Sequence, residues 1–174
     1  EQTAEPMSDV DKAATWWHQH ECGGGAMADY CCYGSVLSYW YAGESATAAS
    51  GMRINSMTLA ADAEDNSAMM VRFPHCYAVL EGTWTTVNHT FKSPIVYGER
   101  GAIVGDYKTG KVLLYREDNT VEEIENDPLP PELRDVASAY VHHRDTGNPL
   151  HHTALPPFNL EALAILDAGL RSAD

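Results

Sequence analysis

The residues best suited to chemistry lie between Gly23 and Tyr33, where three glycines precede a helix-like segment that carries Asp29. Asp29 and Tyr33 are four residues apart, so a helix would place both side chains on one face. A carboxylate beside a phenol can position a hydroxyl group and transfer its proton. We expect Gly24 and Gly25 to contact the substrate, because glycines before a helix allow close approach and leave free amides at its positive end. Periodicity alone favours a structural interpretation, in which the glycines are a flexible link, Asp29 is solvated and Tyr33 packs in the core.

Aromatic and imidazole side chains directly precede the glycines. Trp17 and His18 are candidate substrate contacts for this reason, although tryptophans such as Trp16, Trp17 and Trp84 are more often core or interface residues. The alternating His18, His20 and Cys22 match no standard zinc spacing, and ligands two residues apart do not converge on a helix. We therefore predict no metal site.

The segments around this motif predict helices first, then strands, then helices. Ser8 followed by Asp11 resembles a capping box, and Gly43 stands where a glycine would end the second helix. Helices are expected at about 8–20, 26–42, 131–143 and 159–172. Seven short apolar or alternating runs predict strands at 50–58, 68–73, 77–84, 90–97, 102–104, 111–116 and 120–124.

This order indicates one α+β domain over residues 1–174, with a largely antiparallel, open-faced β-sheet of about six strands and helices packed on one face. The second face of the sheet also carries apolar residues. We expect it to be buried against a partner subunit or another domain, which predicts a homodimer or a larger oligomer.

The composition excludes several classes of partner. With 11 Lys and Arg against 25 Asp and Glu, the net charge is −14, which argues against binding nucleic acid or an anionic membrane surface. No apolar run reaches the roughly 18–20 residues of a membrane span. The four cysteines could form two disulfides, but the adjacent Cys31 and Cys32 favour reduced thiols in a cytoplasmic protein.

The glycine motif resembles the opening of the C-terminal domain in the glucose–fructose oxidoreductase, inositol dehydrogenase and MocA (Gfo/Idh/MocA) family. That opening has a glycine pair or triplet, an apolar pair, an Asp, and four residues later a His or, in some members, a Tyr. Further segments resemble the family in the same order, namely Ala42-Gly43, Val71-Arg72-Phe73, the turn 97–102 and the terminal helix 164–173.

The resemblance implies the substrate-binding and dimerisation half of an NAD(P)-dependent oxidoreductase that acts on a hydroxyl or carbonyl group of a sugar or polyol. Asp29 would orient this small carbohydrate-like substrate, and Tyr33 would act as acid and base. A free tyrosine titrates near pH 10, so Tyr33 would need a nearby cation. In the family, a Lys from a Glu-Lys-Pro motif and the oxidised nicotinamide could supply it. By the same resemblance, the loop with His151 and His152 would reach the substrate.

The sequence lacks the family's N-terminal Rossmann domain, because it contains no Gly-x-Gly-x-x-Gly after a strand, no βαβ alternation and no Glu-Lys-Pro. We therefore expect the chain alone to bind no NAD or NADP and to be inactive. The alternative is a free-standing, non-catalytic domain that forms a sheet-mediated dimer and binds a small carbohydrate-like ligand or a partner protein. A chance match of the glycine motif in an unrelated α+β domain also stays open.

Overall fold

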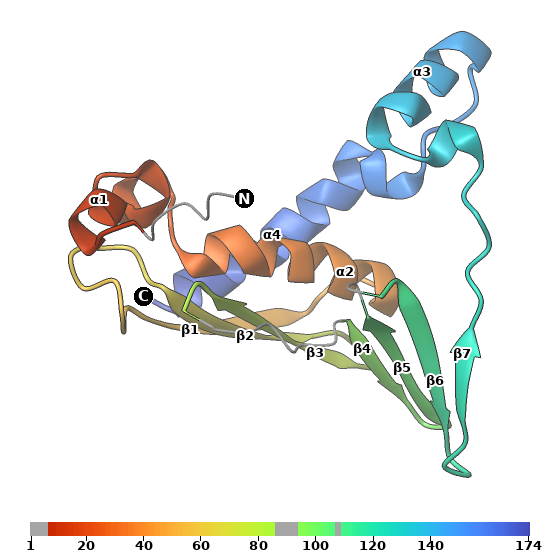
Figure 1. Ribbon diagram of the computed structural model, residues 1–174, viewed down its shortest axis with the longest axis horizontal. Helices are drawn as coiled ribbons and strands as arrows, with labels where there is room; N and C mark the ends of the chain where they lie inside the picture. The colour runs from red at the N-terminus through yellow and green to blue at the C-terminus, as the bar shows by residue number, and fades with distance from the viewer. Residues whose placement is uncertain (1–6, 86–93, 107–108) are drawn as a thin grey trace. The chain divides into compact units, whose positions relative to one another are not determined.

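Two sets of antiparallel strands, each hydrogen-bonded into its own sheet, organise the chain (Figure 1). The computed structural model describes residues 7–85, 94–106 and 109–174. Residues 1–86 and 151–174 form a first unit, and residues 87–150 form a second. The candidate site lies in the first unit.

The first unit begins with α1 (Asp9–Ala13), which is shorter than predicted. Ser8 caps this helix as the capping-box pattern predicted, because its hydroxyl accepts the amide of Asp11 at 3.2 Å.

The Thr15 hydroxyl donates to the carbonyl of Lys12, a local bond that competes with continuation of the helix. Two single-turn 3-10 helices follow, Trp16–His18 and His20–Cys22, in place of the rest of the predicted helix.

The second helix occupies its predicted place but opens irregularly. Its first turn, Met27–Cys31, is π-helical, and α2 (Cys32–Ala42) continues it as a regular helix. Gly43 ends α2 in the left-handed conformation, as predicted.

Three strands form the sheet of the first unit, β1 (Ala48–Ile54), β2 (Asn66–Arg72) and β3 (Tyr77–Thr83). They pair antiparallel in the order β1-β2-β3. Side chains alternate between the two faces, so Met69 and Val71 are buried beneath the helices whereas Met70 between them is exposed.

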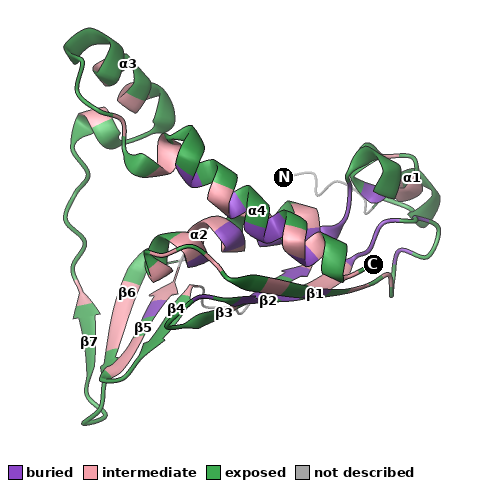
Figure 2. Cartoon of the chain, turned by 180° about the vertical axis from the view of Figure 1, so that it is seen from behind, coloured by how far each residue is buried: buried purple, intermediate pink, exposed green. Residues whose placement is uncertain are grey.

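The core of the first unit lies between this sheet and its helices. The last helix, α4 (Pro156–Ser172), packs on β1 and on α2, and is buried on that side and exposed on the other (Figure 2). The core residues come from the π-helical turn, β2, the turn after it, β3 and α4, and are Met27, Cys31, Met69, Val71, Phe73, Leu80, Ile165 and Leu166.

The second unit contains a four-stranded antiparallel sheet in the order β4-β5-β6-β7 and one α-helix. The strands are β4 (Ile95–Gly98), β5 (Gly101–Asp106), β6 (Lys111–Arg116) and β7 (Val121–Ile124). A 3-10 turn, Pro131–Leu133, precedes α3 (Val136–Thr146), where Asp135 accepts the amide of Ser138 at 2.8 Å as an N-cap.

The α+β class, the antiparallel pairing and the helices on one face of the first sheet are confirmed. Within the described ranges, the strands of the predicted sheet are hydrogen-bonded as a set of three and a set of four. Of the strand predicted at 90–97, residues 90–93 lie outside the described part of the chain, and β4 covers Ile95–Gly98. In the described ranges, no helix combines the length and apolar character that crossing a membrane requires.

Candidate functional site

A cleft of about 570 Å³ opens in the first unit between the N-terminal turns, the π-helical turn and the end of β3. Indole rings and a few polar groups line it. The lining residues are Lys12, Trp16, Trp17, His18, Asp29, Met57, Thr58, Trp84 and Thr85. Three of the sequence-predicted site residues, Trp17, His18 and Asp29, are therefore brought together here.

Asp29 reaches the cleft from the π-helical turn and is held by the indole of Trp84. The Nε1–H of Trp84 donates to Asp29 Oδ2 at 2.9 Å. No described residue is recorded as hydrogen-bonding the other carboxylate oxygen, Oδ1, and the side chain is exposed. Isolated π-helical turns occur frequently at functional sites, and this one sets the direction of the carboxylate.

His18 stands beside the same indole, with its ring centroid 4.7 Å from that of Trp84. Its side chain is buried, and its Nδ1 lies 2.7 Å from the hydroxyl of Thr15. Burial lowers the pKa of His18 below its ordinary value, the charge of Lys12 lowers it further, and Asp65 raises it in part. The imidazole is thus neutral at pH 7.

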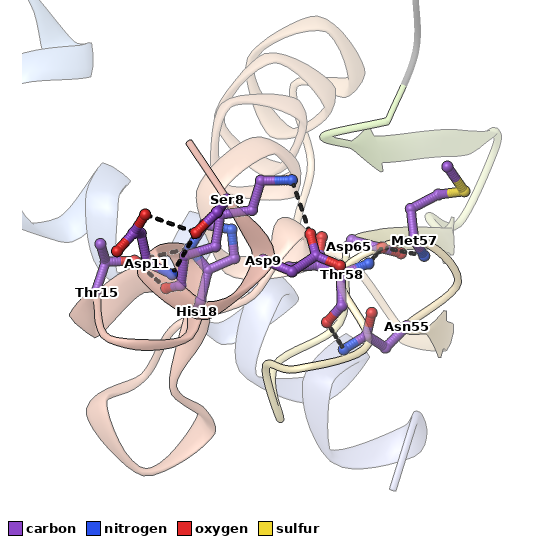
Figure 3. Close-up of polar contacts among 10 residues, drawn as sticks. Ser8, Asp9, Asp11, Thr15, His18, Asn55, Met57, Thr58 and Asp65 are labelled. Atoms are coloured by element: carbon purple, nitrogen blue, oxygen red, sulfur yellow. Dashed lines mark hydrogen bonds and ion pairs between the residues drawn. The ribbon is translucent and has the colours of Figure 1, made fainter. Parts of the chain in front are cut away.

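The wall formed by Met57 and Thr58 is fixed by a buried carboxylate, Asp65 (Figure 3). Its Oδ2 accepts the amides of Met57 and Thr58 at 2.7 and 2.8 Å, and its Oδ1 accepts that of Ser56 at 2.9 Å. Although burial raises the pKa of Asp65, these amides and the Asn66 side chain outweigh it and lower the pKa to about 2.

The glycine triplet serves the packing of the chain itself. The amide of Gly24 donates to the carbonyl of Gln19 and that of Gly25 to the carbonyl of Trp17, each at 3.0 Å. A Cβ on Gly24 would lie 2.3 Å from the carbonyl oxygen of Trp17. The prediction of free amides at these positions is wrong, because both amides donate to carbonyl groups of the turn that carries Trp17.

A carboxylate of the chain also occupies the positive end of the helix. The carbonyl of Glu64 accepts the amide of Ala26 at 2.9 Å, and its Oε1 accepts the amide of Met27 at 3.0 Å. Arg53 lies 3.6 Å from the other oxygen of this buried side chain. The amides of Ala26 and Met27 at the helix N-terminus are therefore already bound by Glu64 of the same chain. Glu64 lies 37 residues from Met27 in the sequence, and no local pattern points to it.

The other predicted site residues lie elsewhere. Tyr33 is 67% exposed and is not among the described residues that line the cleft. A π-helical turn holds more residues than an α-helical one, so the direction of Tyr33 relative to Asp29 differs from that in a regular helix.

The two tandem histidines lie at the far end of α2. The rings of His151 and His152 have centroids 5.6 and 5.9 Å from the Trp40 ring, and neither is among the described cleft residues. The ring centroids of these two histidines are 4.2 Å apart.

Six of the nine cleft residues were not identified as site residues from the sequence, namely Lys12, Trp16, Met57, Thr58, Trp84 and Thr85. Lys12 belongs to the first helix, whose polar side chains are typical of any solvated surface, and Trp84 was interpreted as a core or interface residue. Trp84 lies 55 residues from Asp29 in the sequence, so no local pattern indicates that the two side chains pair.

The cysteines are free thiols, and two of them flank the start of α2. Burial raises the pKa of the Cys31 and Cys32 thiols, so neither is a thiolate at pH 7. Within the described ranges, no three His, Cys, Asp or Glu side chains are grouped to hold a metal ion.

Solved structures share the fold of the chain. An inositol dehydrogenase homologue from Azotobacter vinelandii in complex with NAD+ matches 94% of the chain and 50% of its own, with a TM-score of 0.72 and 15% identity. The aldose–aldose oxidoreductase from Caulobacter crescentus in complex with glycerol matches 91% of the chain and 48% of its own, with a TM-score of 0.70 and 20% identity. The chain thus spans about half the length of these structures.

No curated protein matches the chain in sequence. Residues 2–104, which include the glycine motif, the cleft and the first sheet, match the model of the GFO/IDH/MocA C-terminal domain. The match covers more than half of the chain. The chain therefore belongs to the Gfo/Idh/MocA family of oxidoreductases and contains its C-terminal domain.

Proposed function

We propose that this chain is the substrate-binding half of an NAD(P)-dependent oxidoreductase that acts on a hydroxyl or carbonyl group of a sugar or polyol. The observation that carries the proposal is the position of Asp29 in a cleft with indole walls. Indole rings pack against the C–H faces of sugars and cyclitols, and a carboxylate accepts hydrogen bonds from their hydroxyl groups.

In this proposal Asp29 Oδ1 accepts a hydrogen bond from the substrate hydroxyl, while Trp84 holds Oδ2. The substrate carbon that carries this hydroxyl would then face the hydride donor or acceptor. Tyr33, which is exposed and follows Asp29 by four residues, is proposed to transfer the hydroxyl proton in the assembled enzyme. A similar structure, an inositol dehydrogenase homologue in complex with NADH and myo-inositol, supports a polyol as the substrate class.

The described residues do not fit the dinucleotide itself. The helix N-terminus after the glycines, which could attract a phosphate, is occupied by Glu64. We propose that a Rossmann domain outside this chain binds NAD or NADP, which supplies the hydride acceptor or donor. The four free thiols support a cytoplasmic location for the protein.

The test uses the full-length protein that contains this chain, assayed with NAD+ and NADP+ against polyols and aldoses. We expect oxidation of at least one of them, and a loss of about a hundredfold in kcat/KM for Asp29→Asn. Asp167→Asn is the matched control, since Asp167 pairs with Arg171 on the exposed side of α4. If Asp29→Asn has the activity of the control, the cleft is not the active site.

We also propose that the outer face of the first sheet forms a homodimer interface. This face is exposed and largely apolar, and its apolar residues are Met52, Ile54, Met70, Tyr77 and Val79. Met70 lies opposite Val79 in the ladder, so the two form a continuous apolar strip across β2 and β3. Exposed apolar surface of this kind marks interaction sites in soluble proteins.

A further inference from the structure

We propose that His18 is a fixed hydrogen-bond acceptor for a substrate hydroxyl, and that His18 and Asp29, which both contact Trp84, together recognise a pair of neighbouring hydroxyl groups. This inference rests on the proposed function and specifies its substrate class. The ligand must bring two hydroxyl donors, as a cyclitol or the ring of a neutral aldose does.

The tautomer of His18 follows from the single proton of the Thr15 hydroxyl. Thr15 Oγ1 lies 2.7 Å from the carbonyl oxygen of Lys12, which can only accept, so the hydroxyl proton is directed there. Thr15 Oγ1 also lies 2.7 Å from His18 Nδ1. Because the hydroxyl has no second proton, it must accept from Nδ1–H. The neutral ring therefore carries its proton on Nδ1, and Nε2 has a free lone pair.

The free nitrogen belongs to a buried side chain at the cleft. His18 is 7% exposed and lines the cleft, and no described residue is recorded as hydrogen-bonding its Nε2. This lone pair can accept a hydrogen bond from a ligand hydroxyl that enters the cleft. The depressed pKa, set by burial and by Lys12 against the opposing effect of Asp65, keeps this lone pair available at pH 7.

Trp84 fixes the two acceptors relative to one another. Its ring centroid lies 4.7 Å from that of His18, and its Nε1–H donates to Asp29 Oδ2. His18 Nε2 and Asp29 Oδ1 are both acceptors that cannot donate, so they complement hydroxyl groups. A ligand carboxylate at the same place would meet two lone pairs and the charge of Asp29, which disfavours acidic sugars.

The tautomer can be tested directly on the full-length protein labelled with [15N]histidine. Long-range 1H–15N correlation spectra distinguish protonated from unprotonated ring nitrogens, and the signals missing in His18→Asn identify His18. We expect protonated Nδ1 and unprotonated Nε2 at pH 7, with mixed tautomers in Thr15→Val. A proton on Nε2, or an imidazolium, overturns the proposal.

The recognition of hydroxyl groups is tested by kinetics with myo-inositol, glucose and their monodeoxy analogues. The Asn of His18→Asn can keep an N–H donor for Thr15, while its shorter side chain places no acceptor at the position of Nε2. We expect about a tenfold loss of kcat/KM on the parent compound. With the analogue that lacks the recognised hydroxyl, wild type and His18→Asn should have equal kcat/KM, which a merely structural role of His18 would not produce.

The matched control is His20→Asn, since His20 is exposed in the same segment and is not among the described cleft residues. An enzyme that oxidises these compounds but loses the same factor on every analogue in His18→Asn refutes the inference and leaves the proposed function intact. An enzyme that oxidises none of them refutes the proposed function and, with it, this substrate class.

Discussion

At the scale of single residues, the buried Asp65 links the cleft wall to the stability of the first unit. We predict that Asp65→Asn lowers the free energy of unfolding by about 2 kcal/mol at pH 7, because an amide cannot accept the three backbone amides that converge on this carboxylate. Urea denaturation measures the loss. The exposed Asp167→Asn should change stability by less than about 0.5 kcal/mol.

The same carboxylate predicts a pH dependence. The pKa of Asp65 is about 2 in the folded protein, below its ordinary value of 3.8, so the unfolded chain binds the proton more readily. Its contribution is complete above about pH 4 and is lost as the pH falls from there toward 2. In Asp65→Asn, unfolding curves measured across this range should show a smaller decline. An unchanged decline would assign the acid sensitivity to other groups.

Trp84 offers a second test at this scale. We predict that Trp84→Phe in the full-length enzyme lowers kcat/KM by about tenfold, because the aromatic wall is kept while the N–H that positions Asp29 is lost. Trp16→Phe is the matched control, since Trp16 lines the same cleft and has no recorded hydrogen bond from its indole among the described residues. Equal losses in the two variants would contradict a positioning role for Trp84.

At the scale of elements, the glycine triplet and the π-helical turn determine where the site groups stand. Gly25 has φ +122°, and a Cβ there would lie 2.4 Å from a carboxylate oxygen of Glu64. Gly23, with φ +77°, has no described atom within 4 Å of such a Cβ. We predict a loss of about 3 kcal/mol of stability for Gly25→Ala and about 1 kcal/mol for Gly23→Ala, measured by urea denaturation. Equal losses would mean that Glu64 moves aside without cost.

Most elements could be predicted from the sequence because their signals are local. The Ser8 cap, Gly43 at the end of α2 and the alternation around Met69 each act within a few residues. The π-helical turn and the early end of α1 could not be predicted in this way. They depend on contacts between distant or competing groups, such as Glu64 with the amide of Met27.

The part of the candidate site that depends on local sequence was also predictable, and the part that depends on distant contacts was not. The sequence motif identified Asp29, and its neighbours Trp17 and His18 followed from their position before the glycines. The partnership of Asp29 with Trp84 arises only when β3 pairs with β2 and ends beside the π-helical turn. The expectation of free amides at the glycines was wrong, because these amides donate to a turn that the sequence did not predict.

At the scale of the whole molecule, the outer face of the first sheet predicts the oligomeric state. We expect the full-length protein to be a dimer or larger by light scattering, and Met70→Lys to shift it toward the monomer because a charge would be buried at the interface. The matched control is Leu160→Lys, at an exposed position on α4. A wild-type monomer, or equal effects of the two variants, would exclude this face as the interface.

The first unit is assembled from both ends of the chain, with the second unit inserted between them. Its core includes Ile165 and Leu166 of α4, which pack with Met69 and Val71 of β2. During synthesis on the ribosome, the sheet β1–β3 therefore emerges well before the helix that covers it. Until α4 is complete, the part of the buried face that α4 covers is open to chaperones or to misassembly. By then, every described strand of the second unit is already available to pair.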